Sequence, residues 1–205
     1  MTSIVVVSAG LSVPSSTRLL ADRLAAASDA ALGQAEVTYV ELRDLAHDLT
    51  DNLLTGFPSP RLAEAVEAVR RADGLVAVTP VFSASYSGLF KTFFDVLEPG
   101  ILDGKPVLVA ATAGTARHSL VLEHALRPLF SYLHAVVVPT GVFAATDDFG
   151  DAGLDTRIAR AAAELAVLVG GTPAGQGAGA RRRTLQDGFA DPTPFDELLR
   201  TAGAA

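Results

Sequence analysis

Residues 75–97 read LVAVTPVFSASYSGLFKTFFDVL, and this stretch decides the fold. It opens with a short apolar run, as expected of a strand that is buried on both faces. It closes with apolar residues at helical spacing: Phe90, Phe93, Phe94 and Leu97. Between them, residues 79–87 hold several hydroxyl groups and two aromatic rings. A turn that only reverses the chain is shorter and plainer, so this strand–loop–helix unit is expected to hold a ligand.

The alternation of strand and helix extends along the chain in both directions. Apolar runs predict further strands at residues 4–7, 37–42, 106–111 and 135–138. Amphipathic helices are expected around residues 19–24, 62–69, 122–133 and 158–169. Strands that alternate with helices form parallel sheets through right-handed crossovers. The sequence therefore predicts an α/β domain over residues 1–170. Residues 171–205 are expected to form a Gly-, Ala- and Pro-rich extension with a short terminal helix that begins at Thr193 and Pro194.

Composition narrows the class of protein. The chain has 205 residues, a net charge of −7, 49% hydrophobic residues and no cysteine. An acidic chain without a basic stripe argues against nucleic-acid binding, and the lack of cysteine excludes disulfides and thiol chemistry. No apolar run is long enough for a signal peptide or a membrane span. The four histidines have no HExxH spacing, so no metal site is expected. We expect a cytoplasmic protein.

A second hydroxyl-rich loop follows the first predicted strand. Residues 8–18 read SAGLSVPSSTR and lead into a helix. The free N–H groups and the dipole at a helix start favour an anion, and this loop has more hydroxyls than an N-cap needs. We therefore expect a phosphate site. The dinucleotide motif G-x-G-x-x-G, the P-loop motif and the hydrolase motif G-x-S-x-G are all absent.

Together these loops resemble those of the NAD(P)H-dependent FMN reductase family of flavodoxin-like proteins. Members commonly carry T-P-x-Y/F-x-x-S-x-S/P-G-x-x-K-x-x-x-D, matched here by Thr79, Pro80, Phe82, Ser85, Ser87, Gly88, Lys91 and Asp95. The resemblance covers about residues 3–170. It is strongest to the branch that supplies reduced flavin to two-component monooxygenases. It implies a flavodoxin-like three-layer sandwich with a five-stranded parallel sheet in the order 2-1-3-4-5.

The resemblance also implies which residues hold the cofactors. The FMN phosphate would lie in the first loop, the flavin ring along residues 80–83, and the loop after the fourth strand would close the site. The residues expected to bind FMN are Ser8, Leu11, Ser15, Ser16, Thr17, Pro80, Val81, Phe82, Ser83, Gly114 and Thr115. Arg18 and Arg117 are each expected either to meet a phosphate of the nicotinamide cofactor, NADPH or NADH, or to be solvated. The phosphate contact is favoured for Arg18, because its neighbours already form an anion site.

His124 is the one candidate for a catalytic role. Pro128 removes the N–H that would bond the carbonyl of His124, so the helix is expected to bend or bulge there. In the resembling reductases, an aromatic or histidine residue at this point belongs to a π-helical insertion at a tetramer interface near the flavin. An exposed or interface histidine without a role in catalysis explains His124 equally well.

Two patterns in the helix after Gly88 have simpler interpretations. The phenylalanines, Phe90, Phe93 and Phe94, are expected in the core or in a subunit interface rather than against the flavin. Lys91 and Asp95 have i, i+4 spacing, which favours an ion pair on the helix surface.

The resemblance implies hydride transfer from nicotinamide C4 to N5 of FMN, with the protein aligning the two rings. Reduced FMN would pass to a flavin-dependent monooxygenase, and the chain would assemble as a homodimer or homotetramer. Three alternatives stay open: a quinone, azo or chromate reductase that retains FMN, a flavodoxin-type electron carrier and a redox-sensing module. Relatives of the first alternative often carry an acidic or Asn side chain after Thr-Pro, where this chain has Val81 and Ser83. No flavodoxin phosphate loop is evident.

Overall fold

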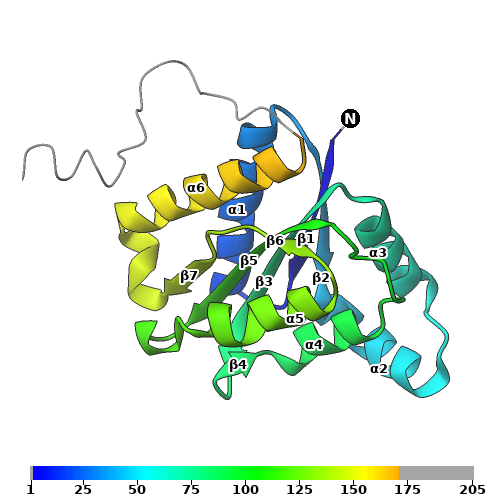
Figure 1. Cartoon of the computed structure of the whole chain (residues 1–205). Helices are drawn as coiled ribbons and strands as arrows, with labels where there is room; N and C mark the ends of the chain where they lie inside the picture. The colour runs from blue at the N-terminus through cyan, green and yellow to red at the C-terminus, as the bar shows by residue number, and fades with distance from the viewer. Residues whose placement is uncertain (1, 171–205) are drawn as a thin grey trace, which may run out of the picture. The chain divides into compact units, whose positions relative to one another are not determined.

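A computed structural model describes residues 2–170, which form an α/β unit around one sheet (Figure 1). The strands are β1 (Ser3–Ser8), β2 (Glu36–Glu41), β3 (Gly74–Phe82), β4 (Ser85–Tyr86), β5 (Pro106–Ala113), β6 (Val136–Val137) and β7 (Val142–Ala145). The α-helices are α1 (Ser16–Leu32), α2 (Ala46–Thr55), α3 (Pro60–Arg71), α4 (Gly88–Asp95), α5 (Arg127–Tyr132) and α6 (Ala152–Leu168). A π-helix spans Leu122–Leu126, and short 3-10 helices span Leu42–Leu45, Ala116–His118 and Thr146–Gly150. The predicted extension, 171–205, with its terminal helix, lies outside the described residues.

The main path of the sheet has the order β2-β1-β3-β5-β6, and all of these neighbours are parallel. This is the doubly wound arrangement of flavodoxin-like proteins, so the predicted fold class is confirmed. The prediction of five parallel strands was wrong, because the sheet has seven strands. Two strands were missed: the antiparallel strand β4, which pairs with β3, and β7, which follows the predicted fifth strand, β6. The order 2-1-3-4-5 therefore does not describe the full set.

Pro139 follows the predicted fifth strand, residues 135–138, which forms as β6. Val138 still donates to the carbonyl of Val107 at 2.9 Å, but Pro139 has no N–H and cannot continue the ladder. The guanidinium of Arg127 donates to the carbonyls of Val138 and Pro139 instead. Parallel pairing with β5 resumes at Val142, in the strand β7, which the sequence pattern did not predict.

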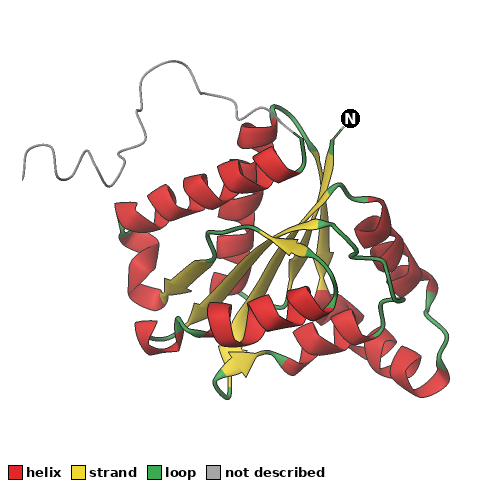
Figure 2. Ribbon diagram, viewed as in Figure 1, coloured by secondary structure: helices red, strands yellow, loops and turns green. Residues whose placement is uncertain are grey.

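Helices cover both faces of the sheet (Figure 2). On one face, α1 and α6 pack against Val6, Val76 and Leu108. On the other face, α2, α3, α4 and α5 pack against their neighbours in the strands, such as Val5 and Leu75. Successive side chains of a strand point to opposite faces, so the side chains of each continuous apolar run pack into the core on both sides of the sheet. The predicted three layers are confirmed.

The helix after Gly88 is part of the core. Phe90, Phe93 and Phe94 are buried, and Phe94 lies 4.9 Å from Phe130 between ring centroids. The expectation that these rings pack in the core is confirmed. Lys91 and Asp95 form the predicted ion pair on the outer side of α4.

Candidate functional site

The loops that follow β1, β3 and β5 meet at the carboxyl edge of the sheet, in the lower part of Figure 1. Ser8 lies opposite Val78, and Pro80 lies opposite Thr112, so the strand register brings the three loops together. The chain runs from β1 outward to β2 and then returns to β3 on the other side of β1. Doubly wound sheets bind ligands outside the strand ends at this switch point.

The first loop forms a cradle at the start of α1. Ser15 is the N-cap, and its hydroxyl accepts a hydrogen bond from the Arg18 N–H at 3.2 Å. The N–H groups of Ser16 and Thr17 have no acceptor within the helix, because they belong to its first turn. A Cβ atom at Gly10 would lie 2.3 Å from the Ser15 hydroxyl oxygen, so only glycine permits this close approach. The helix dipole adds a further preference for an anion.

Two hydroxyl groups lie beneath this cradle. The Ser8 hydroxyl is fully buried and has no hydrogen-bond partner within residues 2–170. A buried hydroxyl without a partner is costly, and a ligand oxygen would satisfy it. The Thr17 hydroxyl is also buried, but it shares a hydrogen bond of 2.8 Å with the Thr112 hydroxyl. Ser8 is therefore the freer donor of the two, and Thr17 joins α1 to β5.

Strands β3 and β4 form a hairpin beside the cradle. Phe82 pairs with Ser85, which leaves Ser83 and Ala84 as a two-residue turn. Both turn residues have positive φ, 48° at Ser83 and 65° at Ala84. Such turns prefer Asn and Gly, so Ser and Ala hold a strained backbone here. Phe82 keeps 47% of its surface exposed, so its side chain is open to a ligand.

The base of the hairpin is clamped by Thr79, which is fully buried. Its hydroxyl accepts from the Ser87 N–H at 3.0 Å and donates to the Pro80 carbonyl at 2.9 Å. The Ser87 hydroxyl then caps α4 by accepting from the Phe90 N–H at 3.1 Å. The strand end, the hairpin and the helix start are thereby fixed to one another.

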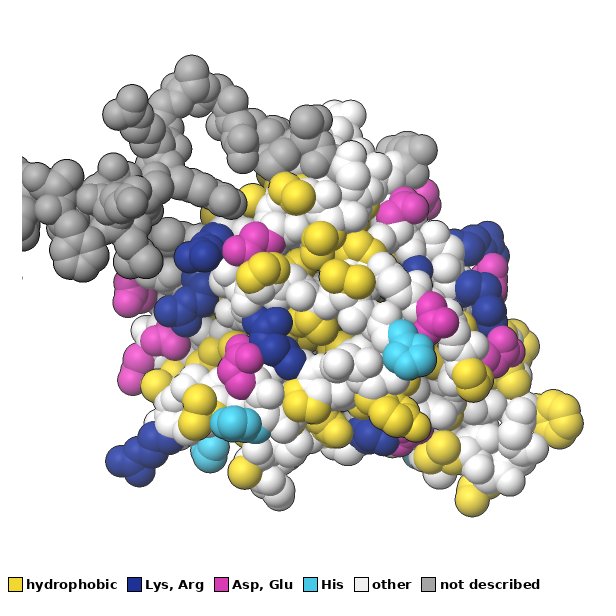
Figure 3. Space-filling view, in the orientation of Figure 1, with side chains coloured by type: hydrophobic (Ala, Val, Ile, Leu, Met, Phe, Trp, Pro, Cys, Tyr) yellow, Lys and Arg dark blue, Asp and Glu magenta, His cyan; other side chains and the backbone are white. Residues whose placement is uncertain are grey.

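The loop after β5 brings basic groups to the same edge. Gly114 and Thr115 follow β5, and the Thr115 hydroxyl accepts from the Arg117 N–H at 3.4 Å. Arg117 and His118 are exposed, and within the described chain Arg117 makes no ion pair. Figure 3 shows basic and histidine side chains beside hydrophobic ones at its lower left, below the end of β5. An exposed, unpaired guanidinium at this edge suits an incoming anionic ligand.

Arg18 is differently placed. Its Nε donates to Asp22 Oδ1 at 2.7 Å, and its Nη1 donates to Glu41 Oε1 at 2.8 Å. Its guanidinium lies 4.3 Å from the centroid of the Tyr39 ring. The hydrogen bond to Asp22 is the main reason that the pKa of Arg18 is raised. Contact between Arg18 and a nicotinamide phosphate stays a prediction.

The helix around His124 is π-helical. The Arg127 N–H bonds the carbonyl of Leu122, five residues earlier, and the π-helix spans Leu122–Leu126. The bulge that Pro128 predicts is confirmed, and π turns are frequent at functional sites. His124 is exposed on this turn. Whether it takes part in catalysis or in assembly stays open.

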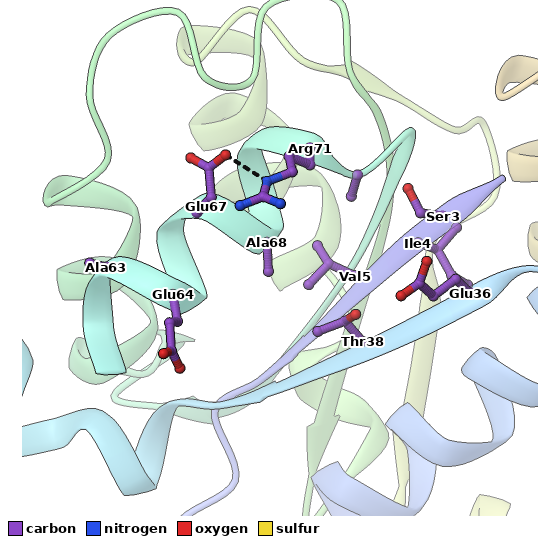
Figure 4. A pocket seen from close by; sticks show the side chains of 11 residues that line it. Ser3, Ile4, Val5, Glu36, Thr38, Ala63, Glu64, Glu67, Ala68 and Arg71 are labelled. Carbon is purple, nitrogen blue, oxygen red and sulfur yellow. Dashed lines mark hydrogen bonds and ion pairs between the residues drawn. The ribbon is translucent and has the colours of Figure 1, made fainter. Parts of the chain in front are cut away.

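A groove of about 670 Å³ lies between α3 and the strands β1 and β2. Figure 4 shows its rim, where Arg71 donates to Glu67 at 2.6 Å, facing Ser3 and Glu36. Ser3 and Glu36 are the first residues of their strands, so the groove lies at the amino edge of the sheet. It is separate from the loops described above.

No group of three histidine, aspartate or glutamate side chains within residues 2–170 is arranged to hold a metal ion. None of the helices in that part of the chain is both long and apolar enough to cross a membrane.

A protein-family model described as NADPH-dependent FMN reductase matches residues 2–150. The chain belongs to this family. An FMN reductase (NADPH) of Pseudomonas aeruginosa is 39% identical over 176 residues, which cover 82% of this chain and 92% of that protein. The NADH-dependent FMN reductase SfnF of Pseudomonas fluorescens is 39% identical over 172 residues, covering 82% and 91%. The solved structure of an oxidoreductase from Corynebacterium diphtheriae is 55% identical, with a TM-score of 0.80, covering 82% of this chain and 97% of that one.

The site of this FMN reductase family member fits FMN. A flavin mononucleotide joins a phosphate dianion to a flat, largely apolar ring. The buried Ser8 hydroxyl and the Gly10 cradle suit the phosphate, while the exposed apolar side chains of Leu11 and Phe82 suit the ring. The predicted residues of the first loop and the β3–β4 hairpin are therefore brought together at one edge.

Sequence reasoning missed several groups that shape this site. They are Asp22 and Glu41, which bind Arg18, and Thr112, which binds Thr17. The Thr79 hydroxyl belonged to a recognised motif, but its role as a clamp was not foreseen. Thr112 carried no sequence signal, because it ends an ordinary apolar strand.

Proposed function

We propose that this protein reduces FMN at the expense of NADPH or NADH. A hydride would pass from C4 of the dihydronicotinamide to N5 of bound FMN. The nicotinamide cofactor would thereby be oxidised and FMN reduced. The observation that carries the proposal is the meeting of the α1 cradle and the β3–β4 hairpin at one edge of the sheet, in a chain of the FMN reductase family.

The chain's task is to bind and align the two rings, which brings the reacting atoms to roughly 3–3.5 Å. Ser8, Ser15 and Ser16 would donate to the phosphate, together with the free N–H groups of the first turn of α1. The flavin ring would lie along residues 80–83 beside Phe82. Leu11, Gly114 and Thr115 would border it on the other sides.

Arg117 is the side chain that best suits the nicotinamide cofactor. It is exposed beside the β5 loop and carries its charge without an ion-pair partner in the described chain. A phosphate of NADPH or NADH would supply that partner. The two relatives named above differ in their nicotinamide cofactor, so both cofactors belong in the test.

FMN would act as a substrate that leaves after reduction. Phe82 is the one aromatic residue in residues 80–83, and half of its surface faces solvent. Stacking on an aromatic ring adds about 0.5–1.5 kcal/mol beyond burial, so few such partners mean loose binding of the ring. A flavin-dependent monooxygenase would then receive the reduced FMN. In the alternative case, FMN stays bound and electrons pass to a quinone, azo compound or chromate.

We also propose a cytoplasmic homodimer or homotetramer. Leu54 and Phe57, at the end of α2 and in the loop after it, are each 80% exposed, and Figure 3 shows hydrophobic side chains at the lower right, where α2 lies. The phenylalanines of α4 do not add to this surface, because they are buried within the subunit. Light scattering that gave a monomer at micromolar concentration would rule out this assembly.

Stopped-flow absorbance tests the function directly. The purified protein is mixed anaerobically with excess FMN and then with NADPH or, separately, with NADH. Bleaching of the flavin band over many turnovers, with matching nicotinamide oxidation, is the expected result. A protein that purifies yellow, retains stoichiometric FMN through dialysis and is reduced once would be a flavoenzyme that keeps its cofactor. A flavin that binds but is not reduced by either nucleotide would indicate an electron carrier or a sensing module.

A further inference from the structure

The side chain of Arg18 is held by ion pairs within the protein, beside the cradle. Arg18 follows the cradle directly, and its N–H is capped by Ser15. Its side chain, however, turns toward β2 and joins two carboxylates, Asp22 on α1 and Glu41 on β2. The ring of Tyr39 lies beneath the guanidinium, which fixes its plane. The Nε and Nη1 groups of the guanidinium thus already bond protein carboxylates.

Glu41 lies unusually close to the proposed phosphate site. It is the last residue of β2, and the strand register places it directly opposite Ser8, whose buried hydroxyl has no partner in residues 2–170. Its side chain is only 23% exposed, so water screens its charge incompletely. Asp22 follows one turn after the cradle on α1. Without Arg18, two negative charges would face a site that is meant to hold a phosphate dianion.

We infer that Arg18 is a positioning residue that neutralises Glu41 and Asp22 beside the cradle, and that it does not bond a ligand phosphate itself. This inference rests on the proposed function, because it assumes that FMN phosphate binds in the first loop. The structural basis is the double ion pair, the stacking on Tyr39 and the pairing of Glu41 with Ser8. It gives Arg18 a role different from the predicted contact with the nicotinamide cofactor.

Arg23 offers a matched control on the same helix. Its Nη1 lies 3.5 Å from Asp155 Oδ1, its Nη2 donates to the Phe149 carbonyl at 3.1 Å, and its guanidinium lies 5.5 Å from the Phe149 ring. It is therefore also an ion-paired and stacked arginine. Its partners, however, come from the segment before α6 and from α6 itself, not from the cradle. Arg23→Gln changes the net charge of the protein by the same amount as Arg18→Gln.

The test compares FMN with riboflavin, which has the same ring but no phosphate. Dissociation constants are measured by flavin fluorescence quenching at low and at high salt. The proteins compared are the unaltered protein, Arg18→Gln, Arg18→Lys, Arg23→Gln and the double variant Arg18→Gln/Glu41→Gln. For Arg18→Gln we expect FMN binding about fivefold weaker at low salt, since two nearby charges are unmasked, and much less weakened at high salt. Riboflavin binding should change little. Arg18→Lys keeps the charge and should retain most of the FMN affinity.

The double variant decides between neutralisation and direct contact. If Arg18 neutralises Glu41, removing the Glu41 charge together with the Arg18 charge restores most of the FMN affinity. If the double variant binds FMN as weakly as Arg18→Gln, Arg18 bonds the ligand directly. If Arg23→Gln loses as much FMN affinity as Arg18→Gln, the effect comes from the net charge of the protein alone. An unchanged FMN affinity with a raised KM for NADPH would overturn the inference in favour of the nicotinamide contact. If the unaltered protein does not bind FMN, the proposed function itself is rejected. Thermal melting identifies any variant that is misfolded.

Discussion

The hydroxyl oxygens of Thr17 and Thr112 lie 2.8 Å apart in a buried hydrogen bond between residues 95 positions apart in the chain. This bond joins the first turn of α1, which forms the proposed phosphate cradle, to the end of β5. The loop with Gly114 and Thr115 begins directly after that strand end. The two segments that we propose bind the ligand are therefore joined by a pair of side chains that need not touch it.

Replacement of the N-cap Ser15 by alanine tests the cradle. Ser15→Ala should lose about 0.5–2 kcal/mol of unfolding free energy through the missing cap. It should also lose about 1.5–3 kcal/mol of FMN affinity, because a hydroxyl bonded to a charged phosphate is removed. Ser59→Ala is the matched control, since Ser59 caps α3 with the same 3.2 Å hydrogen bond, to Leu62 N–H, away from the site. Equal FMN losses in both variants, or an equal loss of riboflavin affinity in Ser15→Ala, would place the phosphate elsewhere.

The clamp at the hairpin base gives a second prediction. Thr79→Val keeps the shape of the side chain but leaves the buried Ser87 N–H without its acceptor. We expect a loss of about 1–3 kcal/mol in the free energy of unfolding, measured in urea, together with weaker flavin binding. Thr50→Val on α2 removes an exposed hydroxyl that bonds the Ala46 carbonyl, and it should change stability by less than about 0.5 kcal/mol. Similar stabilities for the two variants would contradict the clamp.

The strained turn of the hairpin predicts a stabilising change. Ser83→Asn combined with Ala84→Gly installs the residue pair that favours positive φ at both positions. The change relieves the strain of the left-handed backbone, and the extra entropy of glycine in the unfolded chain offsets part of that gain. The net result should be about 1 kcal/mol of added stability. Ala26→Gly, at an exposed position within α1, should instead lose about 1 kcal/mol. A destabilised Asn-Gly variant would mean that contacts of the Ser83 side chain hold the turn.

His124 is exposed on its π turn, and its replacement separates ring binding from later steps. His124→Ala should bind FMN with nearly unchanged affinity, since no loop of the cradle or hairpin contains it. We expect a change in oligomeric state or in steady-state flavin turnover, read by light scattering and by nicotinamide oxidation. His118→Ala, also exposed and in the preceding turn, is the comparison variant. If both variants match the unaltered protein in assembly and turnover, His124 has no role in either.

Much of this architecture could be predicted because the local patterns were strong. Continuous apolar runs marked β1, β3 and β5, and Pro128 marked the π turn. The helix α2 was missed because only Leu49 is buried along it, while Leu53 and Leu54 face solvent, so it has no regular apolar stripe. The hairpin strand β4 was missed because Ser83 and Ala84 carry none of the usual turn signals.

The site was foreseen at the level of loops but not of side-chain partners. The resemblance pointed to Ser15 and Thr17 as phosphate ligands, but the sequence alone did not show what each hydroxyl of the first loop bonds. The fold distinguishes them: Ser15 caps the helix, Thr17 binds Thr112, and the Ser8 hydroxyl has no partner among residues 2–170. Partners such as Thr112 and Glu41 come from distant strands, and only the register of the sheet brings them close. No local pattern carries that information.

The break at Pro139 also bears on how the molecule behaves at high concentration. An exposed strand edge invites another chain to pair with it and so promotes aggregation. On the β6–β7 side, Pro139 interrupts the edge, and the carbonyls of Val138 and Pro139 already accept hydrogen bonds from Arg127. On the β2 side, a short strand begins and ends with a glutamate, Glu36 and Glu41. Each edge thus discourages sheet-to-sheet growth by a different means, which favours a protein that stays dispersed while it is synthesised and folds.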